Sequence, residues 1–147
     1  MGKSTLTERN FGLRVLIGHV NHFLNLARQK ELRQYNVAVR QYELLGVIYD
    51  LGSKATLAEI AKEIERKVNV VSRQAVLMEK DGLIKRAKYS SKSKLLRLEL
   101  TQKGLDIVKL ARKSKSLRVT FSFLSQEERQ QIESILNRML IKLRELR

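Results

Sequence analysis

The chain has 147 residues, 43% of them hydrophobic, and its 30 lysines and arginines against 15 acidic residues give a formal net charge of +15. This length suits one main folding unit with a real core and leaves little room for two independent domains. The positive charge favours a polyanionic partner, nucleic acid above all. The absence of cysteine excludes disulfides, thiolate metal sites and thiol redox sensing.

The hydropathy of the sequence gives no sign of export or of a membrane anchor. No segment reaches the roughly 18 apolar residues that a membrane-spanning helix needs. The start, MGKSTLTERN, lacks the apolar core of a signal peptide. We therefore expect a cytoplasmic protein that does not bind a membrane. The chain has no proline and only scattered glycines, so long helices are not interrupted and no flexible linker is expected.

Two helices are predicted in the first third of the chain. Apolar side chains recur at three- and four-residue spacing over residues 13–27, and Thr5 and Glu8 form a capping box upstream, which indicates a helix of about twenty residues. A second, shorter helix is predicted over residues 39–51, with Gly52 as its stop.

The next segment has the pattern of a helix-turn-helix. The motif Thr56 to Glu59 is a capping box, and the two-turn helix behind it has an apolar face made of Leu57, Ile60, Ala61 and Ile64. A break follows near Arg66 and Lys67. Asn69 is then predicted as the N-cap of a second helix, which ends at Asp81-Gly82 and buries Val71, Ala75 and Met78. Two short helices joined by a tight turn are typical of DNA-binding modules.

After Gly82 the hydrophobic period changes from that of a helix to that of a strand. Residues 83–89 and 94–100 are extended runs joined by a polar loop, Ser90 to Ser93, which together predict a β-hairpin, or wing. Between Leu83 and Arg97 there is no acidic residue. The six basic residues in this stretch are Lys85, Arg86, Lys88, Lys92, Lys94 and Arg97.

The rest of the chain is predicted to be helical. Thr101 caps one helix that runs to Ala111, and a capping box from Ser125 to Glu128 begins the last one. Residues 119–124 are apolar and are not assigned to an element. The expected fold is mainly α with a small β-hairpin wing, in which three amphipathic helices flank the winged helix-turn-helix.

The amphipathic helices require apolar cover, which a wing module of about fifty residues cannot supply in full. We expect residues 37–100 to form a DNA-binding lobe, and residues 1–36 plus 101–147 to form a helical dimerisation region within one continuous folding unit. The alternative is a bundle inside a monomer.

The second helix of the helix-turn-helix presents one face away from its buried side. At 100° per residue this outward face holds Asn69, Arg73, Val76 and Lys80. Arg73 suits a guanine, Asn69 an adenine or a phosphate, and Val76 a thymine methyl group. Ser72 and Gln74 flank this face and suit backbone oxygens. The alternative is an ordinary solvated helix surface on which Asn69 is only a cap.

The wing and the start of the helix-turn-helix offer phosphate contacts. Lys92 and Lys94 lie at or beside the hairpin tip, where a side chain can enter a minor groove. The other residues predicted to contact the DNA backbone are Thr56, Lys85, Arg86 and Lys88. Thr56 is included because it lies at a helix N-terminus, where backbone amides can bind a phosphate. Any single lysine here is better explained as a solvated charge, but the whole cluster indicates a polyanion.

The order and spacing of four segments resemble the MarR family of multiple-antibiotic-resistance-type regulators. The segments are TLAEIAKEI, VVSRQAVLMEKDGLIKR, LRLELTQKG and LSQEERQQIESIL. The pieces MEKDGLIKR and LTQKG are the most specific, and the general plan covers nearly the whole chain. The resemblance implies a homodimer built by the first and last helices. It also implies two winged lobes on successive half-sites of a pseudo-palindrome, usually as a repressor released by a small ligand.

The sequence departs from the family pattern at two places. The wing of the family usually carries an Asp-Arg-Arg triplet, and the corresponding positions here are Lys92, Ser93 and Lys94. A lysine is more strongly hydrated than an arginine and lacks its planar fork, so we expect a weaker or less selective minor-groove contact. Val76 and Leu77 are more apolar than the usual pair in the helix, so base preference is expected to differ.

Other kinds of chemistry find little support. His19 and His22 have a spacing that could hold a metal, but no clear third ligand accompanies them, so ordinary surface or interface histidines are expected and no metal. No nucleophile–base pair, glycine-rich phosphate loop or paired-carboxylate pattern is present, so neither an enzyme nor a cofactor is expected. A small-molecule effector is implied by the resemblance alone, without an identity or named ligand residues.

The sequence therefore predicts a transcriptional regulator that binds double-stranded DNA. It is expected to bind a pseudo-palindromic operator as a homodimer, with a recognition helix in the major groove and a basic wing near the minor groove. The family resemblance implies that it acts as a repressor. The alternative is a winged-helix module that binds RNA or an acidic protein.

Overall fold

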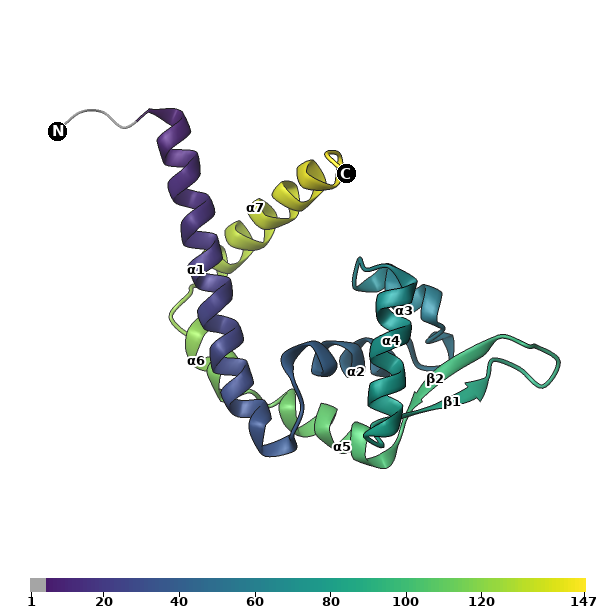
Figure 1. The fold of residues 1–147 in the computed structure, drawn as a ribbon. Helices are drawn as coiled ribbons and strands as arrows, with labels where there is room; N and C mark the ends of the chain where they lie inside the picture. Colours follow the sequence, from purple (N-terminus) through teal and green to yellow (C-terminus); the bar gives the residue numbers. More distant parts are fainter. Residues whose placement is uncertain (1–4) are drawn as a thin grey trace. The chain divides into compact units, whose positions relative to one another are not determined.

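The computed structural model describes residues 5–147 (Figure 1). The helices and strands, in chain order, are α1 (Leu6–Leu32), α2 (Val39–Leu51), α3 (Leu57–Glu63), α4 (Val68–Lys80), β1 (Ile84–Lys88), β2 (Leu96–Leu100), α5 (Gln102–Ala111), α6 (Lys115–Phe121) and α7 (Gln126–Arg144). Two short 3₁₀ turns, Arg33–Tyr35 and Gly52–Lys54, flank α2. The predicted mainly α fold with one β-hairpin is confirmed over the described residues.

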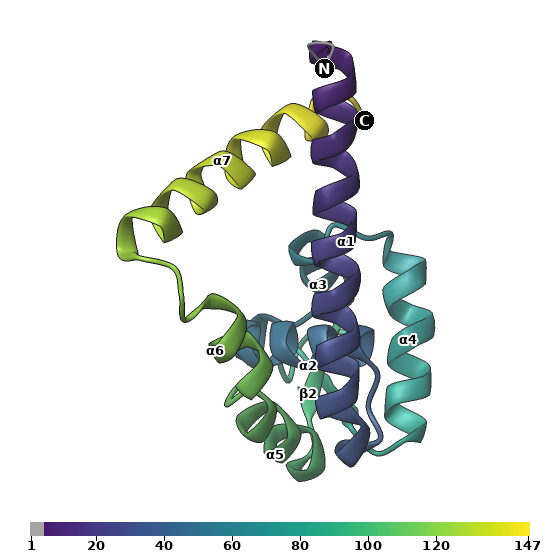
Figure 2. The ribbon, with the colours of Figure 1, turned by 90° about the vertical axis from the view of Figure 1, so that its left-hand side faces the viewer.

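The chain divides into two compact units, one ending at Ser114 and the other formed by Lys115–Arg147. The first contains α1 to α5 and the hairpin, and the second contains α6 and α7. In the first unit the last turns of α1 lie beside α2, as both ribbon views show (Figure 2). No described helix is long and apolar enough to cross a membrane.

The core of the first unit lies where α2, α3, α4, α5 and the hairpin meet. Helix α4 contributes the three side chains that the sequence assigned to its buried face, so that prediction is confirmed. The fully buried larger side chains of this core are Leu44, Leu45, Ile60, Val71, Met78, Leu83, Ile84, Leu98 and Val108. Burial of one such aliphatic side chain contributes about 1.5–3 kcal/mol, so this cluster fixes the position of α4 and of the hairpin.

Helix α1 begins earlier than its apolar periodicity predicts. The Thr5–Glu8 capping box forms in full: the Thr5 N–H donates to Glu8 Oε2 at 2.6 Å, and the Glu8 N–H donates to Thr5 Oγ1 at 3.2 Å. The helix then runs for 27 residues, longer than the predicted twenty. The cap decides the start, because nothing between it and Leu13 breaks a helix.

The turn between α3 and α4 corrects the predicted N-cap. Glu65 adopts a left-handed conformation with φ of +54°, and the Arg66 N–H donates to the Ala61 carbonyl at 2.9 Å, which closes α3 in a Schellman motif. Lys67 is extended, and α4 begins at the next residue, Val68. Lys67 is therefore the N-cap, without a side-chain hydrogen bond, and Asn69 lies inside the first turn.

Two arginines join the helices of the first unit. The buried Arg28 of α1 donates from Nη1 to the Ala111 carbonyl of α5 at 3.2 Å, and its guanidinium lies 4.7 Å from the centre of the Tyr42 ring of α2. Arg112 donates from Nη2 to Asp50 Oδ1 at 2.6 Å, and this hydrogen bond raises the pKa of Arg112 above its ordinary value. Both contacts hold the end of α5 against α1 and α2.

The second unit begins with the segment that the sequence left unassigned. Val119 to Phe121 belong to α6, and the Leu124 N–H then donates to the Phe121 carbonyl at 3.3 Å in the turn that follows. The predicted capping box of α7 is confirmed, because the Ser125 hydroxyl accepts from the Glu128 N–H and the Glu128 carboxylate accepts from the Ser125 N–H.

Candidate nucleic-acid interface

The outward face of α4 is open to solvent. The four residues that the sequence placed there are all exposed, namely Asn69, Arg73, Val76 and Lys80. Ser72 and Gln74 are half-buried on its flanks. The Arg73 Nε–H donates to the Asn69 carbonyl at 3.4 Å, which orients the arginine along the helix surface and leaves its two terminal nitrogens for other acceptors.

The start of α3 uses Thr56 as a structural cap. Its hydroxyl accepts from the Glu59 N–H at 3.2 Å, and its side chain is nearly buried, with 7% of the residue exposed. The backbone around it is tied to the hairpin, since the Leu98 N–H donates to the Ala55 carbonyl at 2.8 Å. The hydroxyl hydrogen of Thr56 is the group left for a phosphate, and its predicted DNA contact stays a prediction.

The hairpin carries its lysines outward from the lobe. Strands β1 and β2 pair antiparallel with Ile84 opposite Leu100, and Figure 1 shows the hairpin projecting away beside α4. The Tyr89 N–H donates to the Leu95 carbonyl at 2.8 Å and extends the pairing towards the tip. Lys88, Lys92 and Lys94 are exposed along this projection.

Acidic residues outside the stretch 83–97 neutralise part of the hairpin's charge. Glu99 lies 3.6 Å from Lys85 Nζ and also forms an ion pair with Arg97. Glu79 of α4 lies 3.3 Å from Arg86 Nε. These contacts are not among the sequence-based predictions. The strand register places Glu99 opposite Lys85 and offers a signal for that pair, whereas the Glu79 contact depends on how α4 packs.

The remaining positive charge is concentrated towards the hairpin tip. Among the described residues, Lys88, Lys92 and Lys94 form no ion pair. The structure thus divides the predicted basic cluster into two parts. Near the lobe, Lys85, Arg86 and Arg97 form ion pairs with carboxylates, whereas the lysines farther along the hairpin form none. We call Lys92 and Lys94 the wing tip from here on. Cationic side chains without internal partners release counterions when they meet phosphates.

The two histidines, His19 and His22, lie on α1. The rings of His22 and Phe23 meet edge to face, with centroids 5.4 Å apart. Within residues 5–147 no group of three histidine, cysteine, aspartate or glutamate side chains is arranged to hold a metal ion.

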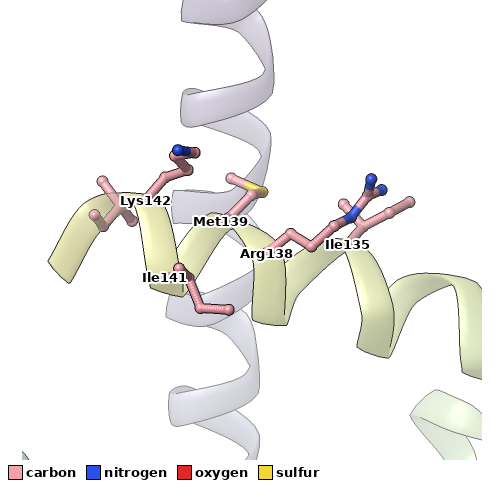
Figure 3. A pocket seen from close by; sticks show the side chains of 6 residues that line it. Ile135, Arg138, Met139, Ile141 and Lys142 are labelled. Atoms are coloured by element: carbon pink, nitrogen blue, oxygen red, sulfur yellow. The ribbon is translucent and has the colours of Figure 1, made fainter. Parts of the chain in front are cut away.

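Apolar surface is exposed on the helices that flank the lobe. On α7 an open groove of about 600 Å³ is lined by Ile135, Arg138, Met139, Ile141, Lys142 and Leu143 (Figure 3). On α1 the exposed apolar side chains are Leu6, Phe11, Leu13, Leu16, Ile17, Val20, Phe23 and Leu26. Soluble monomers rarely expose large apolar patches, so each of these two helices is a candidate for an interface.

The chain is similar to known proteins in structure. No protein-family model matches the sequence, and no curated protein is similar to it. The crystal structure of MepR from Staphylococcus aureus in complex with DNA is similar with a TM-score of 0.79 at 25% identity, over 87% of this chain and 94% of that chain.

Two further crystal structures are similar to nearly the same extent. The organohalide-sensing transcriptional regulator RdhR, bound to 2,4-dichlorophenol, has a TM-score of 0.78 at 25% identity over 95% of this chain and 85% of its own. MepR in its DNA-binding conformation has a TM-score of 0.77 at 25% identity, over 89% and 98%. With the helix-turn-helix and hairpin described above, this likeness shows that the chain has the winged helix-turn-helix fold of MarR-type transcriptional regulators.

Proposed function

We propose that this protein regulates transcription by binding double-stranded DNA, with α4 in the major groove and the wing tip near the minor groove. The observation that carries the proposal is the outward face of α4 beside a hairpin whose unpaired lysines lie towards its tip. The similar MepR structure is a complex with DNA, which supports the same assignment.

The proposed base contacts come from the exposed side of α4. The terminal nitrogens of Arg73 suit the O6 and N7 acceptors of a guanine, and the Asn69 side chain suits an adenine or a phosphate. Ser72 and Gln74 at the flanks suit phosphate oxygens, as does the N-terminal end of α3 at Thr56. Phosphate contacts set the position of the lobe, and the base contacts give the sequence preference.

The proposed wing contacts are electrostatic. Lys92 and Lys94, like Lys88, form no ion pair among the described residues, so their charge is available to DNA. Lys88 lies on the same projection, and Lys85 and Arg86 would exchange carboxylate partners for phosphates. A lysine reaches a narrow groove as a point charge, so this contact adds affinity more than base discrimination.

The proposal includes a homodimer that binds a pseudo-palindromic operator as a repressor. The helical regions at residues 1–36 and 101–147 would form its interface, since α1 and α7 expose apolar side chains that a second copy would cover. Two lobes related by a twofold axis bind half-sites about one helical turn apart. Release by a small-molecule effector belongs to the same proposal, and RdhR bound to 2,4-dichlorophenol offers a parallel.

Selection from random duplex DNA followed by footprinting tests this function. We expect an inverted repeat to be enriched, and its affinity to fall steeply with salt. The upstream region of the protein's own gene is a natural first fragment for mobility shifts. A protein that prefers no duplex over random DNA would lack the proposed specificity. Tighter binding to structured RNA or to an acidic protein would instead identify an interaction module.

A further inference from the structure

Helix α4 carries two exposed aliphatic side chains within its otherwise polar outward face. Val76 is 53% exposed and Leu77 is 59% exposed. At 3.6 residues per turn, Val76 lies about 60° to one side of Arg73 and Leu77 about 40° to the other. Both lie one turn beyond Arg73, so the pair brackets the arginine that the proposed function places against a base.

The lobe itself gives this pair no cover. The packing face of α4 is already filled by Val71, Ala75 and Met78, all fully buried on the opposite side of the helix. The cationic Arg73 and Lys80 lie on the same face as the pair. Two such faces would repel each other, so a second copy of α4 is a poor occupant.

Duplex DNA has one apolar group that reaches into its major groove, the C5 methyl group of thymine. Aliphatic side chains gain nothing from phosphates or from the polar edges of bases, but they gain from covering this methyl group. The cationic neighbours of this pair, Arg73 and Lys80, favour a polyanion such as DNA over an apolar protein surface. The positive charge and the aliphatic side chains of this face therefore both favour a DNA major groove that presents thymine methyl groups.

We propose that Val76 and Leu77 together read the C5 methyl groups of thymines near the base that Arg73 contacts. The inference rests on the proposed function, which it narrows to operators with thymine at defined positions. The rise of 1.5 Å per residue places Val76 about 4.5 Å and Leu77 about 6 Å along the axis from Arg73. With about 3.4 Å between successive bases, these offsets correspond to one to two base-pair steps where α4 follows the groove.

Replacing thymine with deoxyuridine tests this directly, because the exchange removes the methyl group and leaves base pairing intact. The full-length protein is titrated against its selected operator and against copies that carry one deoxyuridine at each thymine position in turn. At two positions per half-site we expect about fourfold weaker binding, the effect of one uncovered methyl group. Deoxyuridine outside the half-sites should leave the affinity unchanged.

Variants assign each methyl group to its side chain. In Val76→Ala one of the two deoxyuridine effects should disappear, and in Leu77→Ala the other, since the remaining side chain no longer reaches the methyl group. Val68→Ala is the matched control, because it shortens another exposed valine of α4 that lies outside this face. Both deoxyuridine effects should persist in it.

The outcomes separate this inference from the proposed function. Specific operator binding that is insensitive to deoxyuridine at every position would overturn the methyl reading and leave the DNA-binding function standing. Deoxyuridine effects that persist in both alanine variants would likewise overturn the assignment to Val76 and Leu77. Failure to select any duplex sequence would overturn the proposed function and the inference together.

Discussion

Gly104 in α5 is a position where the lobe has no room for a side chain. A Cβ atom there would lie 2.2 Å from the Leu83 carbonyl oxygen, which is backbone and also accepts from the Thr101 N–H at 3.1 Å. Close contact between α5 and the start of the hairpin therefore depends on glycine at this residue. The glycine of the LTQKG segment is Gly104, and the packing of α5 against the start of the hairpin requires it.

We expect Gly104→Ala to destabilise the protein by at least about 1–3 kcal/mol, because the backbone of α5 or of the hairpin must shift. Gly46→Ala is the matched control: Gly46 lies in α2, and a Cβ there meets nothing within 4 Å. That variant should gain up to about 1 kcal/mol from helix propensity. Urea denaturation measures both, and equal stability of the two variants would contradict the packing argument.

Arg73 and Lys94 differ in what they are expected to contribute to binding. Arg73→Ala should relax base preference at one operator position and weaken binding by roughly 1–3 kcal/mol. Lys94→Ala should weaken binding to all sequences evenly and flatten the salt dependence by about one unit of slope. Titration against single-base operator variants at several salt concentrations distinguishes the two. Equal, sequence-independent losses would show that Arg73 reads no base.

At the scale of elements, the positive charges of the hairpin are neutralised at the end near the lobe and remain unpaired at its tip. Glu99 pairs with two basic residues of the hairpin, Lys85 and Arg97, and thereby holds their side chains along the strands. Exposed ion pairs contribute little to stability, so their main consequence here is electrostatic. The carboxylate lowers the positive potential of the hairpin on the side nearest the lobe.

Glu99→Gln should therefore strengthen DNA binding without a preference for sequence. Loss of the carboxylate frees Lys85 and Arg97, and we expect a steeper dependence of affinity on salt by about one to two units of slope. Asp106→Asn is a suitable control, because it also removes one negative charge. The Asp106 carboxylate lies on α5 and accepts a hydrogen bond from Gln102, not from a cation of the hairpin. A Glu99→Gln protein with unchanged salt dependence would mean that these cations do not approach phosphates.

The α3–α4 turn shows how one backbone conformation sets an element boundary. Asn69 is a favourable N-cap by residue type, yet the left-handed Glu65 ends α3 early enough for α4 to start at Val68. Asparagine inside the first turn is thereby left with its side chain outward. The shifted boundary leaves the predicted outward face intact, because the buried Val71, Ala75 and Met78 fix the rotation of the helix.

At the scale of the whole molecule, the proposed homodimer depends on the apolar surface of α1. Val20 is exposed on this helix, together with Ile17 one turn earlier. Burial of an aliphatic side chain in an interface is favourable, and burial of an unpaired carboxylate is strongly unfavourable. A charge introduced at Val20 should therefore separate the subunits without disturbing the core around α2 and α4.

We expect Val20→Glu to change the mass measured by light scattering from two chains to one 17.1 kDa chain. Operator affinity should fall as well, because a single lobe binds only one half-site. Asn21→Glu places the same charge on a neighbouring exposed polar residue and should remain dimeric. If the unsubstituted protein is already a monomer at micromolar concentration, the half-site argument fails.

Much of the fold follows from local patterns in the sequence. Helix α2 spans the predicted residues 39–51, and the change of period after Gly82 marks the hairpin. Four predicted capping residues begin helices, namely Thr5, Thr56, Thr101 and Ser125. Caps and periodicity are readable because they involve residues within about one turn of each other. For the same reason, the outward face of α4 could be named from spacing alone.

The sequence by itself determined the elements other than α6, the net charge and the candidate reading face of α4. Only the tertiary structure decided which charges are paired, since Glu79 meets Arg86 through the packing of α4 on β1 and Arg28 meets Ala111 across 83 residues of chain. It also decided that α4 begins at Val68. These features depend on distances between segments far apart in the chain, and a short sequence window carries no information about such distances.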